Sequence, residues 1–149
     1  MLTALRGMSY VLTSAVLCFA PISAAACSLA LQMSATMSPN SADLTNGDRL
    51  RLVELIINVR NLPLPSQAIV YGYALPDERN PVALAMRRTQ SVVKFLAEMG
   101  VPTTDVVHVE STIVPASSKR EETALADVQF SPICPAGGCG FLCNTPIER

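Results

Sequence analysis

The chain has 149 residues, half of them hydrophobic, and a formal net charge of −1 at pH 7. So small a net charge gives no electrostatic case for binding nucleic acid or an anionic membrane surface. The sequence contains no P-loop, G-x-S-x-G or H-E-x-x-H motif, and its single histidine, His108, has no partner acid or nucleophile evident nearby. We therefore expect a protein without catalytic activity, cofactor or metal site.

Residues 1–26 have the organisation of a secretory signal peptide. Arg6 precedes an apolar run at residues 8–22, and residues 24–26 are three alanines that suit a cleavage site. The run is shorter than the ~20 residues that a spanning helix needs. We expect export to the periplasm, either free or in association with the outer membrane. Cys27 follows the alanines, so a lipid anchor on Cys27 is the alternative to a soluble mature chain.

The rest of the chain suits one domain with a single core. Its predicted elements are a strand at residues 28–37, a helix from about 45 to 61, a strand at about 68–73, a helix at 81–99, a strand at about 106–111 and a last strand within 125–133. The first helix is expected to begin at Thr45, Asn46 or Asp48. Tyr71 and Tyr73 share one side of the middle strand, where they form a stacking wall or simply fill one face of the sheet.

The second helix carries the clearest start and stop signals. Asn80 is a good N-cap, Pro81 suits the first helical position, Gly100 is the expected left-handed C-cap, and Pro102 prevents continuation. One face of this helix is predicted to lie on a sheet, because its apolar residues are spaced by three and four. These residues are Ala85, Thr89, Val92, Leu96 and Met99.

Two basic residues near the start of the same helix, Arg87 and Arg88, are expected on its polar face. A cation there opposes the helix dipole at a cost of a few tenths of a kcal/mol. We therefore expect these arginines to serve a ligand.

Residues 84–96 read LAMRRTQSVVKFL and are followed by Gly100 and Val101. In its spacing this segment resembles the helix of the OmpA-like C-terminal domain, a periplasmic module that binds peptidoglycan. The resemblance covers about residues 28–130. It implies an α+β sandwich of β-α-β-α-β(-β) order, with the helices packed on one face of a small mixed sheet. We place this domain at residues 27–133.

The resemblance also implies a binding site. Arg88 matches the family's ligand-binding arginine, whose planar fork of donors suits a carboxylate of the peptidoglycan stem peptide. The family's aspartate, which answers the amino group of diaminopimelate, falls at Leu75 in this sequence. Asp77 lies two residues further on, where a shortened loop could bring it near Arg88, or it is an ordinary loop acid. Asn80 lies one place from the family's asparagine position, so Arg88, Asp77 and Asn80 are the candidate ligand-binding residues.

Two functions are consistent with this pattern. The first is non-covalent association with the peptidoglycan of the cell envelope, which the retained Arg88 favours. The second is a degenerate domain that no longer binds peptidoglycan and instead docks another envelope protein, which the aspartate lost at Leu75 favours.

Four cysteines remain after the signal peptide: Cys27, Cys134, Cys139 and Cys143. In an oxidising compartment they allow two disulfides in three pairings that the sequence does not rank. If Cys27 is lipidated, three thiols remain and one is unpaired. The spacing of the last three cysteines is not that of a zinc site. We therefore expect residues 134–149 to form a tail stapled by disulfide bonding.

Overall fold

The structure is a computed structural model that describes residues 31–115, 117 and 125–139. Its elements in chain order are β1 (Leu31–Ala35), α1 (Asn46–Arg60), β2 (Ser66–Ala74), α2 (Pro81–Glu98), the short 3-10 helix η1 (Thr103–Asp105), β3 (Val106–Ile113) and β4 (Ala126–Pro132). The expected signal peptide, Cys27 and Cys143 lie outside the described residues. Within the described part of the chain, no helix is long and apolar enough to cross a membrane.

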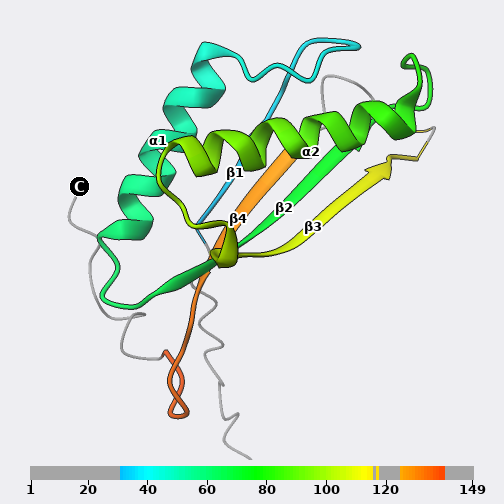
Figure 1. The fold of residues 1–149 in the computed structure, drawn as a ribbon. Helices are drawn as coiled ribbons and strands as arrows, with labels where there is room; N and C mark the ends of the chain where they lie inside the picture. Colours follow the sequence, from blue (N-terminus) through cyan, green and yellow to red (C-terminus); the bar gives the residue numbers. More distant parts are fainter. Residues whose placement is uncertain (1–30, 116, 118–124, 140–149) are drawn as a thin grey trace, which may run out of the picture.

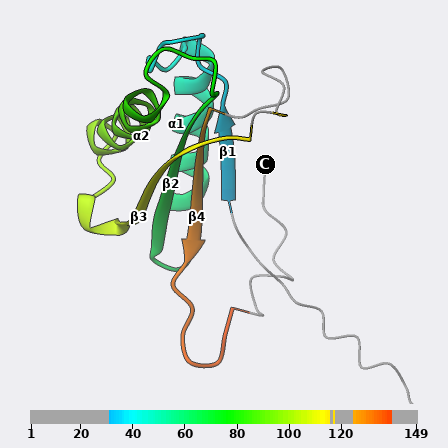
Figure 2. The same cartoon turned by 90° about the vertical axis from the view of Figure 1, so that its right-hand side faces the viewer.

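The four strands form one mixed sheet in the order β1-β4-β2-β3 (Figure 1). β4 lies between β1 and β2 and runs antiparallel to both, whereas β2 and β3 are parallel. Both helices pack on the same side of this sheet (Figure 2). The predicted α+β class, with helices on one face of a small mixed sheet, is therefore confirmed.

The inner face of the sheet follows from the alternation of side chains along β2. Ala68, Val70, Gly72 and Ala74 are buried against the helices, while the residues between them are partly exposed. The core between the helices and the sheet is built from buried residues of both helices and of β1, β2 and β4. They include Leu52 of α1, Val92 and Leu96 of α2, and Val128 and Phe130 of β4.

Helix α1 begins with a capping box. Thr45 is the N-cap among the three predicted candidates, and its hydroxyl accepts a hydrogen bond from the backbone N–H of Asp48 at 3.0 Å. The Asp48 carboxylate in turn accepts the N–H of Thr45. Burial alone would raise the pKa of Asp48, but hydrogen bonds from Thr45, Arg51 and the backbone of Thr36 outweigh burial and leave this pKa below its usual value.

Helix α2 ends as its sequence predicts. Gly100 has φ +79° and lies just beyond the C-cap residue Met99. Its N–H donates to the carbonyl of Ala97 at 3.0 Å, and the N–H of Val101 donates to the carbonyl of Leu96 at 2.9 Å. These two bonds form a Schellman motif, which satisfies carbonyls that the helix end would otherwise leave without donors.

α2 lies unusually close to β2, and Gly72 is the reason. A Cβ atom at Gly72 would lie 2.1 Å from the Thr89 hydroxyl oxygen and 2.6 Å from the carbonyl oxygen of Ala85. The missing side chain therefore lets the second turn of α2 rest on the backbone near the end of β2. This contact places Arg88, the neighbour of Thr89, above the carboxyl end of the strand.

Candidate functional site

Arg88 is the largest fully buried side chain among the described residues, with an exposed fraction of 0%. A guanidinium has five N–H donors, and five hydrogen bonds are made here. Nε donates to the Ser41 carbonyl (2.9 Å), Nη1 to the Tyr73 carbonyl (2.8 Å) and to Glu78 Oε2 (2.6 Å), and Nη2 to the Ser38 carbonyl (3.3 Å) and to Glu78 Oε1 (2.8 Å). All hydrogen-bonding capacity of Arg88 is thus used inside the protein.

Glu78 completes the pair. Both side chains are fully buried, and the two carboxylate oxygens face the guanidinium in a bidentate arrangement. The carboxylate also accepts the backbone N–H of Leu75 at 3.0 Å and that of Asn40 at 2.9 Å. Four hydrogen bonds therefore hold Glu78 in place, and they neutralise a charge that would be costly to bury alone.

Three segments that are distant in the sequence meet at this pair. Arg88 comes from the second turn of α2, Glu78 from the loop between β2 and α2, and the accepting carbonyls of Ser38 and Ser41 from the loop between β1 and α1. Asn40 in that last loop has φ +55°, and its side-chain oxygen accepts the N–H of the residue after Glu78. The ion pair therefore holds together the β1–α1 loop, the β2–α2 loop and the start of α2.

The prediction that Arg88 lies on the polar face of its helix was wrong. Arg87 is exposed as expected, but Arg88 belongs to the buried stripe, four residues before Val92 and three after Ala85. The signal was present in the spacing, since position 88 falls within the apolar periodicity. Arginine is almost never fully buried unless it is paired, so the prediction placed Arg88 on the exposed face despite its spacing.

The other two candidate ligands lie apart from the guanidinium's hydrogen-bond network. Asp77 is exposed, and the acid that pairs with Arg88 is the next residue, Glu78. Asn80 is also exposed and occupies the N-cap position of α2. Its φ is +51° and its side chain makes no capping hydrogen bond, so the expectation of a side-chain cap was wrong. Asparagine tolerates the left-handed region better than most residues, which suits Asn80 to the turn instead.

Leu75 stands where the resembled family has its aspartate. Its side chain is buried, and its backbone N–H donates to Glu78. The acid that faces Arg88 is Glu78, three residues further along the loop. Asp77 was named from the sequence and Glu78 was missed, because nothing in the local sequence marks Glu78 as buried.

The described residues contain one disulfide, between Cys134 and Cys139, with a Cα–Cα distance of 5.3 Å. It closes a small loop directly after β4, as expected for a stapled tail. The other two candidate cysteines, Cys27 and Cys143, lie outside the described residues. No group of three or more His, Cys, Asp or Glu side chains in the described part of the chain is arranged to hold a metal ion.

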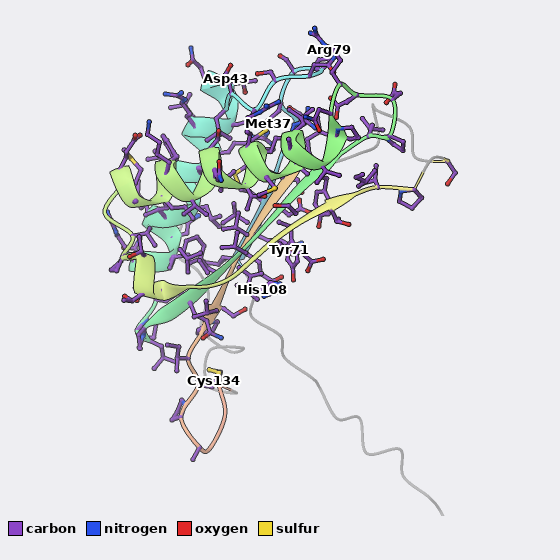
Figure 3. The ribbon with its side chains drawn as sticks, turned by 45° about the vertical axis from the view of Figure 1, so that its right-hand side comes forward. Met37, Asp43, Tyr71, Arg79, His108 and Cys134 are labelled. Carbon is purple, nitrogen blue, oxygen red and sulfur yellow. A yellow bond between two sulfur atoms is a disulfide. The ribbon has the colours of Figure 1, made fainter. Side chains whose placement is uncertain are left out.

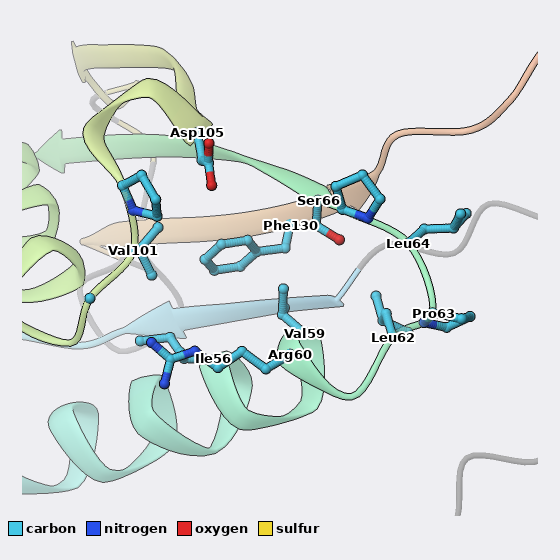
Figure 4. A pocket seen from close by; sticks show the side chains of 13 residues that line it. Ile56, Val59, Arg60, Leu62, Pro63, Leu64, Ser66, Val101, Asp105 and Phe130 are labelled. Atoms are coloured by element: carbon cyan, nitrogen blue, oxygen red, sulfur yellow. The ribbon is translucent and has the colours of Figure 1, made fainter.

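A separate cavity of about 440 Å³ lies at the opposite end of β2 from Arg88 (Figure 4). Most of its lining residues are apolar, and they come from the end of α1, the loop at residues 62–65, the start of β2, the segment after α2, and β4. Its polar groups include Arg60, Asp105 and Ser66, and Arg60 donates a hydrogen bond to the carbonyl of Met99. This cavity could not be predicted from the sequence, because its walls meet only in the folded chain.

No protein-family model matches the sequence, and no curated protein matches it either. Solved structures do match the fold. The periplasmic domain of Helicobacter pylori MotB is 19% identical, with coverage of 69% of this chain and 81% of that chain and a TM-score of 0.52. The OmpA-like domain of FopA1 from Francisella tularensis subsp. tularensis is 14% identical, with coverage of 69% and 73% and a TM-score of 0.50.

A third structure, the cell wall anchor of the T6SS from Pseudomonas aeruginosa, is 13% identical, with coverage of 70% of this chain and 81% of that chain and a TM-score of 0.50. The identities are low in all three cases, whereas most of each chain superimposes. The chain therefore has the OmpA-like fold, in a sequence that has diverged widely from those of its structural neighbours.

Proposed function

We propose that this protein is an exported cell-envelope domain that acts by binding, and that its partner is another envelope protein. The observation that carries this proposal is the buried pair of Arg88 and Glu78. In this proposal Arg88 stabilises the fold through its internal hydrogen bonds and does not bind a ligand.

The argument rests on the count of donors and acceptors around Arg88. A stem-peptide carboxylate could bind the guanidinium only by displacing Glu78, because all five donors are engaged. Displacement would also strip the acceptor from the backbone N–H groups of Leu75 and Asn40. Leaving the buried N–H of Leu75 unsatisfied costs about 1–3 kcal/mol, so the exchange opposes binding.

A second candidate is non-covalent association with peptidoglycan through Arg88, Asp77 and Asn80. Two observations favour it. Arg88 occupies the position that matches the family's ligand-binding arginine, and one structural neighbour is a cell wall anchor. In this alternative a carboxylate of the stem peptide displaces Glu78 from the Arg88 guanidinium, and Asp77 or Glu78 then binds the amino group of the stem peptide.

Both candidates share the same location. We propose a periplasmic domain at residues 27–133, followed by the tail at residues 134–149. Association with the outer membrane would come through lipid on Cys27 rather than through a spanning segment.

Co-sedimentation with purified sacculi separates the two candidates. The chain from Cys27 onward is compared with Arg88→Lys, which keeps the charge but loses the bidentate fork, and with Arg87→Gln, an exposed neighbour on the same helix. Circular dichroism first checks that each variant is folded. We expect no specific pelleting of the wild-type chain. Pelleting that Arg88→Lys abolishes and Arg87→Gln preserves would overturn our proposal and establish the second candidate.

A further inference from the structure

The face of the sheet that the helices do not cover combines aromatic and acidic side chains. β2 contributes Tyr71, which is paired with residues of both β3 and β4, and Tyr73, which is paired with Thr112 of β3. Tyr71 lies opposite Asp127 on one side and opposite Glu110 on the other. Because side chains alternate along a strand, these residues all project to the outer face.

The two tyrosines form a nearly parallel pair, with ring centroids 6.3 Å apart and 11° between the planes. His108 on β3 lies beside Tyr71, at 5.8 Å between centroids and a tilt of 60° (Figure 3). Aromatic faces of this kind attract cations through the negative charge of the ring face.

A hollow of about 160 Å³ lies beside the tyrosines, between β1, β4 and β2. Its lining includes Gln32, Ser34, Tyr71, Tyr73, Asp127 and Gln129. Whole small-molecule ligands occupy about 300–1,000 Å³. The hollow therefore has the size for the end of one side chain, and not for a glycan strand.

Asp127 is the group that gives this hollow its chemistry. The Tyr73 hydroxyl donates a hydrogen bond to Asp127, and burial together with this carboxylate raises the pKa of Tyr73 to about 12. The second oxygen, Asp127 Oδ1, is buried and has no hydrogen-bond partner within the described residues. A buried acceptor without a donor is rare in folded proteins and calls for a partner from elsewhere.

The charges on this face are complementary to a cation. Asp127 and Glu110 are acidic, and among the described residues projecting from the outer face the group able to become positive is His108. The His108 Nε2 atom lies 3.3 Å from Glu110 Oε2, and both side chains are about half exposed. The sheet therefore offers two carboxylates and two tyrosine rings, with one exposed histidine beside Glu110.

We propose that this hollow binds an arginine or lysine side chain of a protein partner, so that a basic segment docks across the outer face of the sheet. The cation would pair with the Asp127 carboxylate and lie against the tyrosine rings, with Glu110 adding long-range attraction. This inference rests on the proposed function, since it names the chemistry of the envelope protein that docks.

The test is a titration of the isotopically labelled chain from Cys27 onward, followed by NMR at pH 7.5. The probe is the peptide acetyl-Ser-Arg-Ser-Arg-Ser-amide, and the reference is the same peptide with citrulline, which has nearly the shape of arginine without its charge. We expect shifts at Tyr71, Tyr73 and Asp127, and at least tenfold weaker binding of the citrulline peptide.

Variants locate the site. Asp127→Asn keeps the size of the side chain and should weaken binding at least fivefold, whereas Glu54→Gln removes one exposed negative charge from α1, on the opposite layer, and should not. Equal weakening by both would mean that only net charge matters and would overturn the proposal. Equal affinity for the citrulline peptide, or no shift at the tyrosines, would overturn it as well.

Two further outcomes are distinguishable. Shifts at the tyrosines caused by chitotriose but not by the arginine peptide would overturn the proposal in favour of a sugar-binding face. Pelleting with sacculi that depends on Arg88 would overturn the proposed function and leave the peptide titration unaffected, because Arg88 lies on the inner side of the sheet.

Discussion

Replacing Glu78 with glutamine should destabilise the domain severely. Glutamine keeps the size of the side chain but loses the negative charge, and its NH2 group would face the donors of Arg88, Leu75 or Asn40. The guanidinium would become a buried cation without a countercharge. Breaking a buried pair in this way costs about 3–5 kcal/mol, against a total stability of about 5–15 kcal/mol for a domain.

A double-mutant cycle isolates the pair itself. Arg88→Met leaves the Glu78 anion buried alone, so it should also cost about 3–5 kcal/mol. The double variant, Arg88→Met with Glu78→Gln, removes both charges, yet the carbonyls of Ser38, Ser41 and Tyr73 still lose their donor. We expect the double loss to be smaller than the sum of the single losses, with a coupling of about 2 kcal/mol.

Urea unfolding followed by circular dichroism measures these losses. With a slope of about 1–3 kcal/mol/M, a loss of 3 kcal/mol lowers the midpoint by roughly 1–3 M. Arg87→Gln is the matched control, since Arg87 is exposed on the same helix and its loss should stay within about 0.5 kcal/mol. The reasoning is refuted if Glu78→Gln and Arg88→Met shift the midpoint no more than this control.

Three further predictions concern other parts of the fold. Gly100→Val should cost more than about 1 kcal/mol, because φ at Gly100 is +79°; an unchanged melting temperature would contradict this. Because the pKa of Asp48 is lowered in the folded state, its carboxylate stabilises the fold above the unfolded pKa, and this stability is lost as pH falls below about 4. Asp48→Asn should therefore make the urea midpoint fall less steeply with decreasing pH. An equally steep fall in the variant would be evidence against this prediction. Because the pKa of Tyr73 is raised in the folded state, it contributes stability that is present below pH 10 and lost as pH rises towards 12. Absorbance at 295 nm should show one phenol that titrates near pH 12, and at a lower pH in Asp127→Asn. A titration complete by pH 11 would contradict this prediction.

Local signals made most of the elements predictable. Helix α2 begins at Pro81 and ends at Glu98, close to the expected bounds, because Pro81 and Gly100 act through their own backbone conformation. Thr45 was among three candidate caps, and the capping box with Asp48 decided between them. The first and last strands were predicted from alternation, and the two between them from runs of β-branched residues. The structure extends β2 from Ser66 to Ala74, beyond the predicted limits.

Contacts between distant segments could not be predicted in this way. The partner of Arg88 is set by the path of a loop whose left-handed residue, Asn80, was taken for an ordinary cap. The sheet order β1-β4-β2-β3 places β4 between β1 and β2. Alternation along a strand predicts which of its faces is buried, but it does not predict which strands are neighbours. The unsatisfied oxygen of Asp127 likewise exists only once β1, β2 and β4 are side by side.

The central place of β4 has a consequence for how the chain folds. The last strand of the described residues is inserted between β1 and β2, so Leu31, at the start of these residues, pairs with Phe130 near their end. Pairings this distant in sequence form slowly, because a long loop must close before they stabilise anything. A chain that stops before residue 126 has β1 and β2 without the strand that joins them. Any process that handles the protein before its last strand is available, whether synthesis or the export proposed above, therefore meets an unfinished sheet.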